Sequence, residues 1–139
     1  MKRIISIFSI LTVCVLLTAI VVHAQANSAT ITLLNPPAGG ELHLSAGQSY
    51  TFDIAIDSDT QFVQAIALVD QYFPGRGVRD QGAQVVVGQT SAVLHMTVTA
   101  VGATARLANG VYPITLIVGV RYGGGQVVYQ AYPVNVIVS

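Results

Sequence analysis

Residues 112–138 read YPITLIVGVRYGGGQVVYQAYPVNVIV, two apolar runs on either side of three consecutive glycines. Every even-numbered residue of the first run is aromatic or branched aliphatic: Tyr112, Ile114, Leu116, Val118, Val120 and Tyr122. A period of two is typical of a strand with one buried face. The glycines supply the chemistry of a turn. The sequence therefore predicts a β-hairpin with strands at 112–122 and 126–138.

A three-residue turn at 123–125 sets the register of this hairpin. Tyr122 then lies opposite Gln126, and every further pair keeps the same index sum of 248. This register puts the apolar even-numbered residues of both strands on one face, which we expect to be the core, because a turn one residue shorter or longer would separate them.

The odd-numbered residues of the hairpin then point outward and form a second apolar face. Contiguous apolar surface exposed to solvent usually marks a contact site. An aromatic ring can also cover a bare glycine on a neighbouring strand, so we expect Tyr129 to lie across Gly119. The residues predicted to form this interaction face are Ile117, Gly119, Val127, Tyr129 and Ala131.

The rest of the chain from Ala29 onward alternates in the same way between strand patterns and turn residues. Further strands are predicted at 30–34, 41–44, 50–57, 83–87 and 92–99. Seven or eight strands separated by Gly, Pro, Asn and Asp turns predict an all-β fold, an antiparallel β-sandwich. Gln61–Phe73 has apolar residues at both strand and helix spacing, and its β-branched and aromatic residues favour a strand. The alanine-rich stretch 101–108 is a candidate for a single helical turn.

The N-terminus has the pattern of a secretory signal peptide. Lys2 and Arg3 precede the uncharged apolar segment 4–22, and Ala24-Gln25-Ala26 has the small-residue spacing that signal peptidase accepts. We expect cleavage after Ala26, which leaves one domain at 27–139. The alternative is that the segment stays as a membrane anchor. No other apolar run is long enough to span a bilayer, so no membrane span is expected in the mature chain.

Cleavage changes the charge of the chain. Removing Lys2 and Arg3 from six basic residues leaves four arginines against six acidic residues, a formal charge of −2. The mature chain lacks the basic patch that nucleic-acid binding requires. The single cysteine, Cys14, leaves with the signal, so the mature domain has no disulfide and depends on its apolar core.

Residues 98–138 resemble a known kind of module. They contain Val98-Thr99-Ala100, then Asn109-Gly110-Val111-Tyr112-Pro113, then Arg121-Tyr122-Gly123-Gly124-Gly125, then Val134-Asn135-Val136-Ile137-Val138. This pattern is similar to the C-terminal half of the bacterial and archaeal immunoglobulin-like modules named CARDB and NEW3, found in surface-layer and adhesin proteins. The resemblance implies a fibronectin-III-like sandwich outside the cell or on its surface, with no catalytic residues. Tyr112 is in addition a candidate tyrosine corner, with an ordinary inward aromatic as the alternative.

Catalytic and metal-binding patterns are weak. His43 and His95 alternate with apolar residues on strands, which predicts outward positions, and no Gly-x-Ser-x-Gly elbow offers a nucleophile. The chain is not expected to be an enzyme or to bind a cofactor. Asp53–Asp59 offers oxygen ligands but no partner loop for calcium. Arg76–Asp80 combines two arginines with Gly77 and could hold a carboxylate or sugar acid by bidentate contact; the alternative is a solvated loop whose arginines pair with Asp70 and Asp80.

The sequence thus predicts a secreted or cell-surface, non-catalytic binding or assembly module, which associates with a protein partner or with itself. The alternative is a small exported binding protein for a metal or an acidic ligand. That alternative would use the loops Asp53–Asp59 or Arg76–Asp80.

Overall fold

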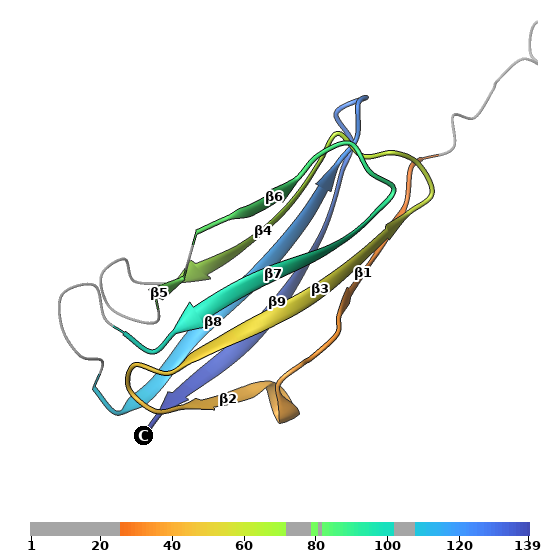
Figure 1. The fold of residues 1–139 in the computed structure, drawn as a ribbon. Helices are drawn as coiled ribbons and strands as arrows, with labels where there is room; N and C mark the ends of the chain where they lie inside the picture. The colour runs from red at the N-terminus through yellow and green to blue at the C-terminus, as the bar shows by residue number, and fades with distance from the viewer. Residues whose placement is uncertain (1–25, 72–78, 81, 102–107) are drawn as a thin grey trace, which may run out of the picture.

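A computed structural model of the 139-residue chain describes residues 26–71, 79–80, 82–101 and 108–139. In these residues the strands form two sheets packed face to face (Figure 1). The elements are β1 (Ala29–Leu33), the 3-10 turn η1 (Ala38–Gly40), β2 (Glu41–Leu44), β3 (Ser49–Ser58), β4 (Gln64–Gln71), β5 (Arg79–Asp80), β6 (Gln84–Val86), β7 (Ser91–Thr99), β8 (Gly110–Arg121) and β9 (Val127–Val138).

The order of the strands is that of an immunoglobulin-like sandwich. One sheet has the order β1-β3-β7-β5 and the other β2-β9-β8-β4-β6. These orders match the ABED and CFG sheets of the immunoglobulin fold, with additional strands at both edges of the CFG sheet. The structure confirms the predicted fold class.

One strand pair departs from the predicted antiparallel arrangement. The chain leaves the first sheet after β1 and joins the second as β2, which runs parallel to the end of β9. Gly39 and Gly40 carry φ angles of 63° and 74° at this crossing, a left-handed conformation that favours glycine. The expectation of a purely antiparallel sandwich is therefore corrected at this pair.

All eight segments predicted as strands contain strands, and the described residues add a ninth. This ninth strand, β5, is only two residues long and lies in a segment expected to be a loop. The ambiguous segment Gln61–Phe73 contains β4, as its composition favoured. The helical turn predicted at 101–108 falls mainly on residues 102–107, which lie outside the described residues.

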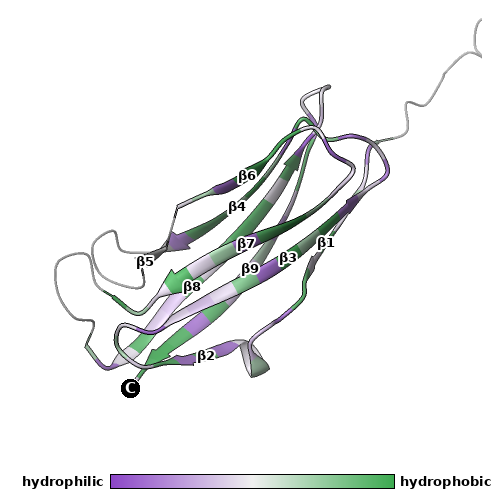
Figure 2. Ribbon diagram, viewed as in Figure 1, coloured by the Kyte–Doolittle hydropathy of each residue, from purple (hydrophilic) through white to green (hydrophobic). Residues whose placement is uncertain are grey.

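Both sheets contribute large side chains to a dry core. Those with less than 2% exposure include Phe52, Ile54, Ile56, Leu94 and Met96 from one sheet, and Leu116, Val118, Val120 and Val136 from the other. Within the described residues no polar or charged residue is buried. Figure 2 shows the resulting alternation of apolar and polar residues along the strands.

Tyrosine hydroxyls form hydrogen bonds at both ends of the sandwich. The Tyr112 hydroxyl donates to the Ala108 carbonyl oxygen at 2.7 Å, which confirms the predicted tyrosine corner. At the other end, the Tyr122 hydroxyl lies 2.7 Å from Ser58 Oγ and 3.0 Å from the Ser28 carbonyl oxygen. These bonds join β8 to the segments that enter β1 and leave β3.

Candidate interaction face

The hairpin of β8 and β9 has the predicted register. Gly110 pairs with Val138 and Arg121 with Val127, so the index sum of 248 holds along the whole hairpin without a bulge. The even-numbered residues of β8 from 114 to 120 are buried, as are Val134, Val136 and Val138 of β9. The odd-numbered residues consequently lie on the outer surface of the five-stranded sheet.

The five residues predicted for the interaction face differ in exposure. Tyr129 and Val127 are 71% and 55% exposed, and Ala131 is also exposed. Ile117 and Gly119 are half-buried, because they lie on β8 between β9 and β4. Cross-strand pairing brings Ile117 opposite Ala131 and Gly119 opposite Tyr129. The structure thus brings all five together on one side of the sheet.

The cover of Gly119 differs from the prediction. A Cβ built on Gly119 would meet Ile66 Cγ2 at 3.7 Å, and no Tyr129 atom comes within 4 Å. Ile66 is the residue directly opposite Gly119 on β4. The expectation that Tyr129 lies across Gly119 is therefore wrong, since the branched side chain of Ile66 reaches that space from the other neighbouring strand.

Strand β4 extends the apolar face beyond the hairpin. Ile66 and Leu68 are half-buried on the same side and lie opposite Gly119 and Ile117. Val85 of β6 follows in the Ile66 row and is 45% exposed. These residues were not predicted, because the period of two marks a strand but does not tell which of its two faces is inside.

The outer face of the four-stranded sheet is polar by comparison. Its cross-strand neighbours on β3 and β7 form hydrogen bonds: Thr51 Oγ1 lies 2.7 Å from Thr97 Oγ1, and Asp53 Oδ1 lies 2.6 Å from His95 Nδ1. Hydroxyl, carboxylate and imidazole groups on an exposed sheet surface are well solvated. Among the described residues, the exposed apolar side chains are therefore concentrated on the outer face of the five-stranded sheet.

Asp53 and Asp59, described residues of the alternative ligand site, each have a hydrogen-bond partner within the protein. Asp59 Oδ2 accepts hydrogen bonds from the Ser28 backbone N–H at 3.0 Å and from Ser28 Oγ at 3.1 Å, while Asp53 pairs with His95. Over the described ranges no three His, Cys, Asp or Glu residues gather as metal ligands. Arg76 lies outside those ranges, and the backbone of Arg79–Asp80 pairs with β7.

The two histidines of the described residues lie on different sheets. His43 lies on β2 of one sheet and His95 on β7 of the other, and both are exposed as predicted. Among the described residues, the acidic neighbour of His43 is Glu41, with 3.7 Å between Nε2 and Oε2. Neither histidine has a serine or cysteine as its described hydrogen-bond partner.

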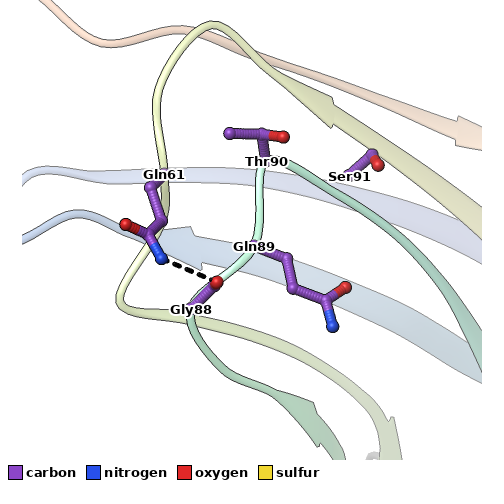
Figure 3. Close-up of a pocket in the computed structure, with 5 residues that line it drawn as sticks. All are labelled: Gln61, Gly88, Gln89, Thr90 and Ser91. Carbon is purple, nitrogen blue, oxygen red and sulfur yellow. Dashed lines mark hydrogen bonds between the residues drawn. The ribbon is translucent and has the colours of Figure 1, made fainter.

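A shallow hollow lies between the loop that enters β4 and the loop that enters β7 (Figure 3). Its lining residues are Gln61, Gly88, Gln89, Thr90 and Ser91. Gln61 Nε2 donates to the Gly88 carbonyl oxygen at 2.7 Å and so joins the two loops. This lining offers amides and hydroxyls for hydrogen bonding and carries no charge.

Tyr132 of β9 is directed away from the apolar face toward β1. Its hydroxyl donates to the Ile31 carbonyl oxygen at 3.0 Å. Burial raises the pKa of the Tyr132 phenol above its usual value, because the anion would lose solvation.

No helix in the described part of the chain has the length and apolar character needed to cross a membrane.

Among known proteins, the chain matches solved structures but no family model and no curated sequence. The resemblance to CARDB and NEW3 modules therefore stays a prediction. Native α-2-macroglobulin from Escherichia coli, from domain MG7 to the C-terminus, is 14% identical with a TM-score of 0.44; the match covers 84% of this chain and 17% of that one. The CooA pilin subunit from enterotoxigenic Escherichia coli is 8% identical with a TM-score of 0.43, over 81% and 97% of the two chains. The chain thus spans about a sixth of the first structure's length.

Proposed function

We propose that this chain is an exported, non-catalytic binding or assembly module that uses the outer face of β4, β8 and β9. The observation that carries the proposal is the apolar surface formed by Ile117, Gly119, Val127, Tyr129 and Ala131, with Ile66 and Leu68 beside them. The outer face of the four-stranded sheet is polar by comparison. The apolar face is therefore not simply a result of the high apolar content of the chain.

The chemistry of this face suits a protein surface. Covering apolar area contributes about 25 cal/mol per Å² removed from water, and the most exposed side chain is the large ring of Tyr129. Tyrosine is among the residues enriched at energetically dominant contact positions. Ile117, Gly119 and Arg121 of β8, with the residues opposite them on β4 and β9, form three rows across the face. Arg121 is the one charged residue in these rows, and it supplies a polar boundary at one end.

Export is the second part of the proposal, and it rests on residues 1–26. We expect signal peptidase to cleave after Ala26, because Ala24 and Ala26 follow an apolar segment with the required spacing. N-terminal sequencing of the exported protein should begin at Asn27. A full-length product that remains in the membrane would contradict cleavage and favour the anchor.

The interaction face is tested with a charge at its centre. Ile117→Glu and Tyr129→Glu are expected to leave folding largely intact and to weaken self-association or partner binding at least about tenfold, since a desolvated carboxylate without a partner disfavours the complex. Circular dichroism and thermal melting report folding, and sedimentation velocity reports association.

Val93→Glu is the matched control for these variants. Val93 is an apolar residue, 48% exposed, on the outer face of the opposite sheet. We expect this variant to fold and associate like wild type. If Ile117→Glu and Tyr129→Glu also associate like wild type, the proposed face is not the contact surface.

A further inference from the structure

Strand β9 has a neighbour on both sides only over its last four residues. In the described residues, β2 pairs with Asn135–Val138, whereas residues 127–134 pair with β8 alone. A strand with one unpaired side presents a row of N–H and C=O groups to which another strand can bind. We call this unpaired row at residues 127–133 the β9 edge.

The alternation of hydrogen bonds tells which residues face outward at the β9 edge. The Tyr122 backbone N–H donates to the Gln126 carbonyl oxygen at 2.9 Å, so even-numbered residues of the hairpin bond across it. The Ser139 backbone N–H donates to Leu44 of β2 at 3.2 Å, so odd-numbered residues of this segment face away from β8. In the unbroken register between these bonds, Val127, Tyr129 and Ala131 direct both backbone groups outward, and Pro133 directs its carbonyl.

The β9 edge lacks most of the features that protect edge strands from pairing. Residues 127–134 contain no charged residue, and the constant register leaves no bulge. Pro133 is the one protective residue, and it stands at the end of the row. The opposite edge of the same five-stranded sheet is β6, which is only three residues long and so offers a much shorter row.

We infer that the β9 edge binds the same edge of a second copy, antiparallel about a twofold axis at Tyr129. In this register Val127 pairs with the partner's Ala131 and Tyr129 with the partner's Tyr129, and each pair exchanges two hydrogen bonds. No bond requires the missing N–H of Pro133. A twofold contact of this kind closes on itself and joins the two five-stranded sheets into one.

Self-pairing also extends the apolar face. Residues that are directly opposite each other on antiparallel strands point to the same side of the sheet. The row Ile66, Gly119 and Tyr129 would therefore continue into the partner's Tyr129, and an edge without charges brings no like charges together. This inference rests on the proposed function and names its partner as a second copy of the chain.

Ala131→Pro tests the β9 edge with little effect on the monomer. Proline is tolerated in an edge strand where the N–H points to solvent, and Pro133 already occupies the equivalent position two residues away. Wild type is expected to form dimers that dissociate on dilution. Ala131→Pro removes two symmetry-related hydrogen bonds and should weaken the dimer at least about tenfold.

Ala131→Val is the matched control, because it adds a side chain of similar size and keeps the N–H. Both variants are compared with wild type by sedimentation equilibrium and by amide hydrogen exchange in NMR. In the dimer, the amides of Val127, Tyr129 and Ala131 should become protected as concentration rises, while the even-numbered amides are protected at all concentrations by β8.

The outcomes separate this inference from the proposed function. A dimer lost in Ala131→Pro and kept in Ala131→Val, with the odd-numbered amides protected, supports edge pairing. A wild type that stays monomeric up to about 1 mM, or a dimer that persists in Ala131→Pro with those amides exchanging freely, overturns it. In the latter case, a dimer that Ile117→Glu still weakens retains the outer face as the contact surface.

Discussion

Replacing Phe52 with alanine is expected to lower the free energy of unfolding by about 3–5 kcal/mol. Its ring is completely buried on β3 and packs edge-on against Tyr50, with ring centroids 5.0 Å apart and an interplanar angle of 71°. Single domains are stable by about 5–15 kcal/mol in total. A chain with one cysteine has no internal disulfide to offset the loss, so the variant should be close to unfolding at 37 °C.

Urea denaturation followed by circular dichroism measures this loss. Val93→Ala is the control on the neighbouring strand β7, where the side chain is 48% exposed and the expected change is within about 0.5 kcal/mol. Equal losses in the two variants would show that the core is not where the structure places it.

Leu116→Asp is expected to abolish folding, with a loss of about 5 kcal/mol or more. Leu116 is 0% exposed on the inner face of β8. The substitution removes roughly 2–3 kcal/mol of apolar burial and adds several kcal/mol for a carboxylate that is desolvated without a partner. Within the described residues no basic residue is buried beside it.

The neighbouring substitution Ile117→Glu provides the contrast, because it carries the same charge on the opposite face of the same strand. Near-ultraviolet circular dichroism and NMR line dispersion should show a folded domain for Ile117→Glu and an unfolded chain for Leu116→Asp. The reverse result would mean that β8 is turned by one residue.

The hairpin of β8 and β9 was predictable in detail because its determinants are local. Two long alternating series and a turn of known length leave one register that brings both apolar series together. The same local pattern allowed two roles for Tyr112, a tyrosine corner or an ordinary inward aromatic, and the bond to Ala108 decides for the corner. The five face residues therefore had their side of the sheet assigned before any tertiary contact was known.

The orientation of β4 was not predictable in this way. Its inner residues include the small Ala65 and Ala67, while the larger Ile66 and Leu68 point outward. Hydrophobicity alone favours the larger side chains inside. In the structure Ala65 and Ala67 belong to one core cluster with Phe62 and the large side chains of the opposing sheet. Which side chains fit inside depends on the volume that such neighbours leave in a close-packed interior.

The crossing from β1 to β2 was also decided by tertiary structure. The sequence shows two short strands separated by prolines and glycines, which fits a hairpin as well as a change of sheet. Pairing of β2 with the last four residues of β9 satisfies that part of the edge and leaves residues 127–134 open on that side. The free row of backbone groups has no counterpart in any sequence pattern.

Taken by itself, the amino-acid sequence determined the all-β class, the strand positions and the register of the C-terminal hairpin, because periodicity and turn chemistry act over a few residues. Tertiary structure decided which face of β4 is buried, what covers Gly119, and which edge stays unpaired. These depend on volume and hydrogen bonds contributed by strands that are distant in the chain, such as β4 beside β8 and β2 beside β9. Local patterns carry no information on such neighbours until the two sheets have packed together.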